Sequence, residues 1–292
     1  MKIRSISCAA FLASVFLYHA APGRGSQAEC EIPFRYQGHL IVVEASIGAM
    51  TGLRFMIDTG ATGSVVDRKV VKALGLEQLP GESQIIALGQ VAKAHRFHIP
   101  VLRIGPVFAV FDCREADLSG LGVDGIIGLD LLRQQIRLAN CKTNEAVKGR
   151  SFAIDFKTRR LHFGIRQQLD HTVPLEAPNP QLIVVAMIKG HPLRLAVDTG
   201  SYTIVLFKEP QMRWLEPRVI HQRARLQMVG RLGGGKQVIL PDMELGNSRW
   251  TNPGGILVDL PNEAKDGLLS VKQLGLKILH FDFERNLMSW KK

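Results

Sequence analysis

Two short segments place an aspartate, a threonine and a glycine directly after an apolar run. Asp58-Thr59-Gly60 follows Phe55-Met-Ile57, and Asp198-Thr199-Gly200 follows Leu195-Ala-Val197. A carboxylate at the end of a buried strand is costly unless it finds hydrogen-bond donors or takes up a proton. The glycine lets the backbone turn so that its N–H groups face the carboxylate, and the threonine hydroxyl can brace the loop. Each segment therefore has the composition of a loop that presents a reactive carboxylate.

The chemistry depends on whether Asp58 and Asp198 become neighbours. Two adjacent carboxylates do not both ionise readily, because their negative charges repel, so the pair shares one proton. One aspartate then acts as general base toward a water molecule, and the other acts as general acid toward the leaving group. Such a pair hydrolyses amide bonds with no metal, no cofactor and no nucleophilic side chain. We expect a peptide or protein substrate.

The sequence around the two segments repeats. Residues 193–206 restate residues 53–66, and Asp58 and Asp198 are 140 positions apart. The later matches keep the same order: Gly89 with Gly230, Pro100 with Pro241, Gly105 with Gly246, Asp124-Gly125 with Asp266-Gly267, and residues 152–163 with 279–290. This ordered series predicts two similar lobes in tandem, residues 29–169 and 170–292.

The pattern of apolar runs favours an all-β chain. Short Val, Ile, Leu and Phe runs alternate with glycine and proline, as is typical of strands joined by turns. The polar segment 165–174, which ends in proline, is predicted to connect the lobes. Hairpins are expected at residues 40–57 and 182–197, and the few expected helices are at residues 68–75, 130–137 and 271–274.

The first 28 residues match a secretory signal. Residues 1–4 are basic, residues 6–21 are apolar and uncharged, and Ser26-Gln-Ala28 fits a cleavage site. We expect export to the periplasm or secretion, and no stable membrane insertion after the signal is removed. The alternative is an uncleaved N-terminal membrane anchor. Removal of residues 1–28 lowers the formal net charge from +11 to +8.

The remaining composition excludes some functions. The basic residues occur in small scattered groups with no nucleic-acid-binding signature, so no nucleic-acid partner is expected. Of the three cysteines left in the mature chain, Cys113 and Cys141 are the closer pair and are predicted to form a disulfide. No cysteine pair has metal-ligand spacing. His95 and His98 have no acid or cysteine beside them, so no metal site is predicted.

The two segments, together with Asp124-Gly-Ile-Ile-Gly-Leu-Asp-Leu-Leu132, resemble aspartic peptidases of the retropepsin and pepsin type. The resemblance covers nearly all of the mature chain. It implies two closed-barrel-like lobes related by a pseudo-twofold axis, a cleft between them, and Asp58 and Asp198 as the catalytic pair. Residues 58–61 and 126–130 look closer to the retroviral-like branch, although one chain holds both lobes as in pepsin. We expect a monomer.

The resemblance also assigns supporting roles. Thr59 and Thr199 correspond to the interlocking threonines, and Gly60 and Gly200 to the turn glycines. Hairpin flaps that close over the substrate are expected at residues 87–94 and 229–236. The glycines expected to make these flaps mobile are Gly89, Gly230, Gly233, Gly234 and Gly235.

The second copy departs from the first at two positions. Ser270 replaces Gly128, which in the resembled family lets the backbone approach the catalytic loop closely. Ser201 stands opposite Ala61, and we hypothesise that its hydroxyl holds Asp198 ionised and leaves the shared proton nearer Asp58. The sequence therefore predicts an exported aspartic endopeptidase. The alternative is a catalytically inactive peptide-binding module on the same fold.

Other polar residues are interpreted as structural. Asp124 and Asp266 each precede a glycine and are expected to form local turns. Asp67 is expected to cap the helix that begins at Arg68, which requires no chemistry. His95 and His98 are expected on a strand surface near a flap.

Overall fold

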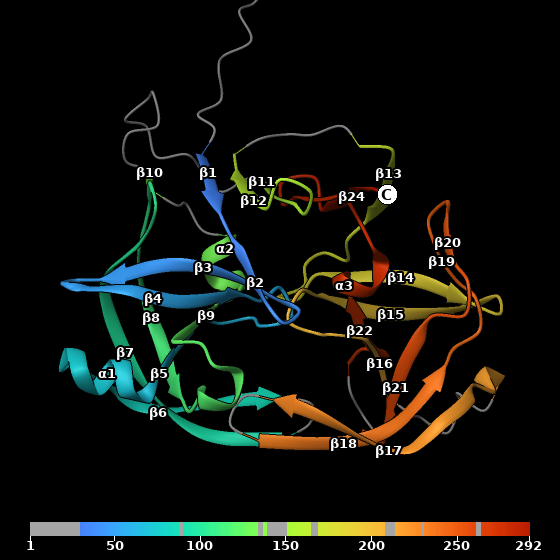
Figure 1. Cartoon of the computed structure of the whole chain (residues 1–292), viewed down its shortest axis with the longest axis horizontal. Helices are drawn as coiled ribbons and strands as arrows, with labels where there is room; N and C mark the ends of the chain where they lie inside the picture. The colour runs from blue at the N-terminus through green and yellow to red at the C-terminus, as the bar shows by residue number, and fades with distance from the viewer. Residues whose placement is uncertain are drawn as a thin grey trace, which may run out of the picture.

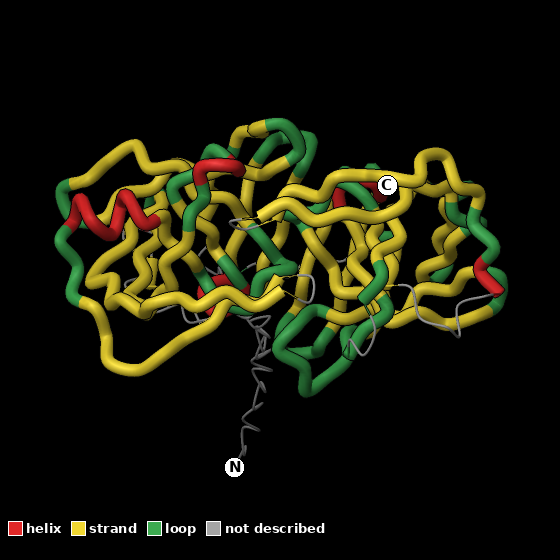
Figure 2. Tube along the Cα trace, turned by 90° about the horizontal axis from the view of Figure 1, so that it is seen from below, coloured by secondary structure: helices red, strands yellow, loops and turns green. Residues whose placement is uncertain are grey.

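The computed structural model describes residues 30–87, 90–133, 137–138, 151–164, 169–207, 214–228, 231–260 and 264–292. The predicted signal segment, residues 1–28, lies outside this part of the chain. The described chain is mostly β-strand, and its two lobes lie side by side along the long axis (Figures 1 and 2). The prediction of an all-β fold is confirmed.

The first lobe is a sheet that closes on itself. Its strand order is β10-β8-β5-β9-β4-β3-β7-β6, with β2 beside β3, and a further pairing of β8 with β7 closes a ring. The strands are β2 (Arg35–Gln37), β3 (Leu40–Ile47), β4 (Met50–Ile57), β5 (Val65–Asp67), β6 (Gln78–Ala87), β7 (Gln90–Ile104), β8 (Val107–Ala116), β9 (Gly125–Ile127) and β10 (Arg137–Leu138). The closed barrel predicted for this lobe is therefore present.

The second lobe repeats the central pairings of the first. The β15–β22 pair is parallel like β4–β9, and β16 pairs in parallel with β21 as β5 does with β8. Its strand order is β17-β18-β21-β16-β22-β15-β14-β19-β20. The strands are β14 (Ile183–Ile188), β15 (His191–Asp198), β16 (Ile204–Phe207), β17 (Arg218–Met228), β18 (Arg231–Ile239), β19 (Met243–Leu245), β20 (Ser248–Trp250), β21 (Gly254–Val258) and β22 (Gly267–Ser270).

Both lobes have a proline at a matching position, but only in the second lobe does the strand break there. Pro100 lies inside β7, where the pairing with β8 shifts register between Ile99 and Leu102. At the matching Pro241 the strand is interrupted, because β18 ends at Ile239 and β19 begins two residues after the proline. Proline has no N–H to donate to a sheet, so it is tolerated at a bulge or a break. Within the described residues, the second sheet does not close by strand pairing.

A third sheet joins the lobes. Its order is β1-β12-β11-β23-β24-β13, and the central antiparallel pair β11–β23 places Phe152 opposite Phe281. The strands are β1 (Cys30–Pro33), β11 (Ser151–Asp155), β12 (Arg160–Phe163), β13 (His171–Pro174), β23 (Ile278–Asp282) and β24 (Leu287–Lys291). Part of the predicted connector is thus wrong, because residues 171–174 form an edge strand paired with β24. Residues 165–168 lie outside the described part of the chain.

The hydrophobic core is continuous across both lobes. One cluster of buried side chains includes Phe55 of the first lobe, Phe152 and Phe281 of the shared sheet, and Leu195 of the second lobe. Burial of this much apolar surface is the main favourable contribution to folding. Because the cluster is shared, the core holds the two lobes in a defined relative position.

The helices are short. Helix α1 (Arg68–Leu74) has Asp67 as its N-cap and Gly75 at φ 60° as its C-cap, so the predicted capping role of Asp67 is confirmed. Helix α3 (Val271–Leu274) has the predicted bounds. Helix α2 (Leu129–Leu132) is shorter than predicted, and a 3-10 turn, η1 (Ser119–Leu121), was not expected.

The predicted disulfide is wrong. Cys113 on β8 is a free, buried thiol, and Cys30 on β1 is disulfide-bonded. Cys113 lies inside the barrel of the first lobe, and burial raises the pKa of its thiol to about 12. Proximity in sequence was a poor guide here because the barrel encloses this thiol.

Candidate active site

The two Asp-Thr-Gly loops meet between the lobes. Asp58 follows β4 and Asp198 ends β15, and each of these strands is braced by a parallel neighbour from its own lobe, β9 or β22. The backbone N–H of Asp58 donates to the carbonyl of Ile127 on β9 (3.0 Å). The apolar strands therefore deliver both aspartates to the same place.

The two threonines bind each other's loops. The Oγ1 of Thr59 donates to the carbonyl of Val197 (2.8 Å) and accepts the N–H of Thr199 (3.1 Å). The Oγ1 of Thr199 donates to the carbonyl of Ile57 (2.8 Å) and accepts the N–H of Thr59 (3.0 Å). Both side chains are fully buried. This reciprocal set is the pattern expected of a pseudo-twofold relation, which stays a prediction.

Backbone N–H groups hold both carboxylates. The N–H of Gly60 donates to Asp58 Oδ1 (2.8 Å), and the N–H groups of Gly200 and Ser201 donate to Asp198 Oδ1 (2.7 and 3.0 Å). A Cβ at Gly60 would lie 2.6 Å from the Cγ of Asp198, and one at Gly200 would lie 3.0 Å from the Cγ of Asp58. Each glycine therefore faces the carboxylate of the other lobe, so close approach requires glycine here.

The environment favours a protonated Asp198. Burial, and next the negative charge of Asp58, raise the pKa of Asp198 well above its ordinary value, against the N–H groups that bind it. Burial also raises the pKa of Asp58, to a smaller extent. The Ser201 hydroxyl donates to the carbonyl of Thr203 (2.7 Å), whereas the backbone N–H of Ser201 donates to Asp198. The hypothesised contact between this hydroxyl and Asp198 is therefore wrong.

In each lobe the segment behind the catalytic loop binds the carbonyl of the residue that follows the turn glycine, but the donor differs between the lobes. In the first lobe the N–H of Leu129 donates to the carbonyl of Ala61 (2.9 Å), and a Cβ at Gly128 would lie 2.8 to 2.9 Å from backbone atoms of the loop. In the second lobe the Oγ of Ser270 donates to the carbonyl of Ser201 (2.7 Å). The serine thus replaces a close backbone approach with a side-chain hydrogen bond.

The end of each loop is held by a side-chain acceptor, and this acceptor differs between the two lobes. In the first lobe Asp130 accepts the N–H of Ser64 (2.8 Å) and its Oγ–H (2.6 Å). In the second lobe the Oε1 of Gln273 accepts the N–H of Ile204 (3.0 Å) and the hydroxyl of Thr203 (2.9 Å). A carboxylate and a carboxamide therefore perform the same positioning task.

Two hairpins lie at the predicted flap positions. Strands β6 and β7 pair up to Ala87 and Gln90, and β17 and β18 pair up to Met228 and Arg231. Both hairpins run along the face opposite the six-stranded sheet (Figure 1). Ile86 and Val91 pair near the first tip and are 68% and 51% exposed, so this flap presents an apolar surface.

The glycines assigned to the flaps have different positions. Gly89 and Gly230 fall at the tips and lie outside the described residues. Gly233, Gly234 and Gly235 lie within β18 and pair with β17, and the mobility expected of them stays a prediction. A Cβ at Gly235 would lie 2.5 Å from the carbonyl oxygen of Leu257, which shows that glycine permits β18 to approach β21.

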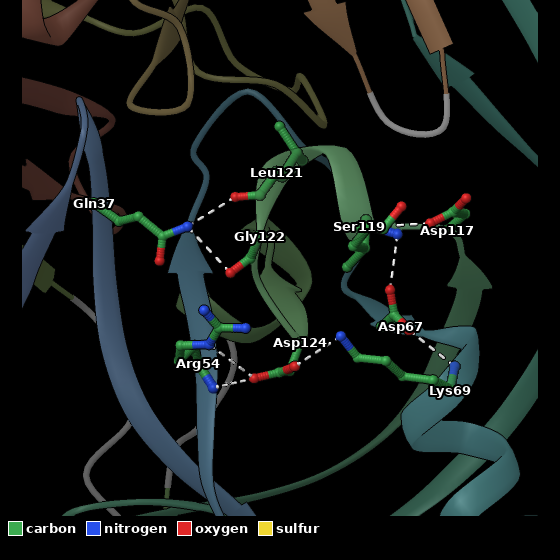
Figure 3. Close-up of polar contacts among 10 residues, drawn as sticks. Gln37, Arg54, Asp67, Lys69, Asp117, Ser119, Leu121, Gly122 and Asp124 are labelled. Carbon is green, nitrogen blue, oxygen red and sulfur yellow. Dashed lines mark hydrogen bonds and ion pairs between the residues drawn. The ribbon is translucent and has the colours of Figure 1, made fainter.

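The aspartates interpreted as structural hold the ends of the barrel. Asp124 accepts the N–H of Arg54 (2.9 Å) and pairs with Lys69 (3.3 Å), while Asp67 accepts the N–H groups of Lys69 (2.9 Å) and Leu118 (2.8 Å), as Figure 3 shows in part. In the second lobe Asp266 accepts the N–H of Arg194 (2.6 Å) in the manner of Asp124. Asp124 and Asp266 thus bind backbone N–H groups 70 and 72 positions away and do not make the local turns that were predicted, whereas the capping role of Asp67 is confirmed.

Gln37 fixes the segment that precedes Asp124. Its Nε2 donates to the carbonyls of Leu121 (2.9 Å) and Gly122 (3.1 Å), which Figure 3 also shows. The histidines near the first flap are paired as well: His95 with Glu115 (2.8 Å) and His98 with Asp112 (3.0 Å). Both histidines therefore pair with acidic residues of β8.

Sequence reasoning missed one residue beside the catalytic loops. His39, in the turn between β2 and β3, donates from Nε2 to the carbonyl of Gly200 (3.0 Å), and its ring meets that of Tyr202 edge-on at 5.5 Å. The two partners are more than 160 positions from His39 in the chain. Its place after Gly38 indicates a turn and nothing about the second lobe, so no local signal could have found this contact.

Within the part of the chain that the structure describes, no group of His, Cys, Asp and Glu side chains could hold a metal ion. Among the same residues, no helix has the length and apolar character needed to cross a bilayer.

The two lobes bring together interlocked threonines and a buried aspartate pair. Residues 43–131 match the family model described as aspartyl protease. The matched region runs from β3 to α2 and includes Asp58, so the first lobe is similar to the aspartyl protease family. The resemblance to retropepsin-like aspartic peptidases is confirmed. No curated protein matches the chain in sequence.

Proposed function

We propose that the protein is an aspartic endopeptidase that hydrolyses peptide bonds with a water molecule activated between Asp58 and Asp198. One observation carries this proposal: Thr59 and Thr199 lock the two loops together, so that each turn glycine faces the aspartate of the other lobe. The family match of the first lobe supports a peptidase function in general.

We assign the starting roles from the surroundings of the pair. Asp198, whose pKa is raised by burial and by the negative charge of Asp58, is proposed to carry the shared proton, with Asp58 as the ionised base. Asp58 takes a proton from the water, whose oxygen forms a bond to the amide carbon while Asp198 gives its proton to the carbonyl oxygen. When the resulting diol collapses, the C–N bond breaks and a proton passes to the leaving nitrogen. Carboxyl and amino products form, and the pair returns to its starting state.

The substrate we propose is an extended peptide held between the catalytic loops and the two flap hairpins. Ile86 and Val91 present an apolar surface near the first flap tip, which suits apolar peptide side chains. We further propose that the enzyme works as a monomer after export to the periplasm or secretion. The signal-like residues 1–28 support export.

The test is cleavage of a mixed peptide library by the mature protein across a range of pH, with and without a statine-type inhibitor. The activity of the Asp58→Asn variant should be about a hundredfold to ten-thousandfold lower, because the general base is removed. The matched control is Asp170→Asn, a change at an exposed aspartate that should leave activity unchanged.

The outcomes separate the two functions considered. Cleavage that both the inhibitor and Asp58→Asn abolish supports the endopeptidase. A folded protein that binds peptides and cleaves none at any pH would instead be a peptide-binding module on this fold.

A further inference from the structure

A cavity of about 90 Å³ lies behind the second catalytic loop. It opens between the β2–β3 turn, the end of α3 and the chain that follows β11, which is the side of the loops facing the six-stranded sheet. Thr199 lines it from within. The walls are formed mainly by Tyr36, His39, Phe156, Lys272 and Leu276.

Comparison with the first lobe shows how the cavity arises. There, α2 ends at Arg133, whose guanidinium donates to the carbonyls of Asn179 (2.9 Å) and Pro180 (3.1 Å) and lies 5.7 Å from the ring centre of Phe283. Helix α3 ends instead at Gly275, with φ 63°, and a Cβ there would have no atom within 4 Å. The space that Arg133 fills in one lobe has no side chain in the other.

The walls suit an anion with an apolar body. Phe156 and Leu276 supply apolar surface, whereas Lys272 Nζ and Arg159 Cζ lie 5.4 and 5.7 Å from the ring centre of Tyr36. Neither cation has an ion-pair partner among the described residues. The Tyr36 hydroxyl is a further donor, and burial keeps it protonated by raising its pKa. Lys272 and Tyr36 therefore add a positive charge and a hydroxyl donor to the wall of a largely apolar cavity, and Arg159 lies near the Tyr36 ring.

We propose that this cavity binds a small organic carboxylate, with its apolar body against Phe156 and its carboxylate at Lys272. Roughly three waters would occupy the same volume, so the site accepts one ring or one branched side chain. Two sources share this chemistry: a free aromatic acid and the C-terminal residue of a peptide.

The bound acid would contact the catalytic loop directly. Thr199 lines the cavity, and His39 links it to the carbonyl of Gly200. Occupancy is therefore expected to alter the position of the second catalytic loop. The proposal concerns binding alone, so its test does not require peptidase activity.

The experiment is calorimetric titration of the mature chain with benzoate, and with benzamide as the neutral isostere. We expect saturable benzoate binding and at least tenfold weaker benzamide binding, because only benzoate carries the charge. Lys272→Gln, a change at an exposed side chain, should weaken benzoate binding about tenfold. The matched control is Lys72→Gln, since Lys72 lies in the last turn of α1 as Lys272 does in α3.

A second titration with N-acetylphenylalanine distinguishes the two sources. Tighter binding of this acid than of benzoate supports a peptide C-terminus as the ligand, and the reverse supports a free aromatic acid. The proposal is overturned if neither acid binds saturably up to about 10 mM, if benzamide binds as well as benzoate, or if Lys272→Gln has no effect.

Discussion

The two Asp-Thr-Gly loops make equivalent contacts with each other, in front, but different contacts with the segment of their own lobe that lies behind them. Thr59 and Thr199 make the same pair of contacts in opposite directions. Behind them, the first loop is approached by Gly128, whereas the second is bound by the side chain of Ser270. The contacts that each loop makes with the other lobe are therefore equivalent, whereas the contacts that support each loop within its own lobe differ.

The largest stability effect is expected from the threonines. Thr59→Val or Thr199→Val keeps the shape but leaves a buried carbonyl and a buried N–H without partners. At about 1–3 kcal/mol for each orphaned group, either change should lower the free energy of unfolding by about 2–6 kcal/mol. Denaturant unfolding of both variants measures this. Clearly unequal losses would show that the two loops are not equivalent even in front.

A smaller and unequal effect is expected behind the loops. Gly128→Ser forces a Cβ to within 3 Å of backbone atoms and should cost about 1–3 kcal/mol or more. Ser270→Gly removes the hydrogen bond to Ser201 and the N-cap contact of α3, at about 1–2 kcal/mol. Thermal unfolding of both variants checks the order. If Gly128→Ser were the milder change, the close approach would not be a constraint.

An effect of opposite sign, a pH-dependent gain of stability, is expected in Asp198→Asn. The pKa of Asp198 is raised by folding, so its protonated form stabilises the fold below the unfolded pKa of about 3.9, and this stability is lost as pH rises through the folded pKa. The variant removes that loss, at about 1.4 kcal/mol per unit of pKa shift. Near neutral pH it should therefore melt above the wild type, and at about pH 3 the difference should vanish.

The same measurement on Asp58→Asn sharpens the comparison between the loops. Its gain near neutral pH should be the smaller one, because the pKa of Asp58 is raised less. A larger gain for Asp58→Asn would place the shared proton on Asp58 and reverse the catalytic roles proposed for the pair.

Much of the architecture was predictable because it depends on local pattern. The hairpins around residues 40–57 and 182–197, the α3 bounds and the Asp67 cap follow from apolar periodicity and capping chemistry. Contacts between distant residues were less accessible. Gly233–235 suggested a mobile turn, yet these glycines lie in a strand because β21 passes close to them.

The sequence by itself determined that two aspartates end two equivalent apolar strands, each followed by the threonine and glycine that the loop needs. It could not determine which aspartate holds the proton, because pKa depends on burial and on the charge of a residue 140 positions away. Nor could it reveal that Ser201 turns away from Asp198, that His39 reaches Gly200, or that Gly275 leaves a cavity. Only the packing of the two lobes decides these, because they depend on distances between segments far apart in the chain.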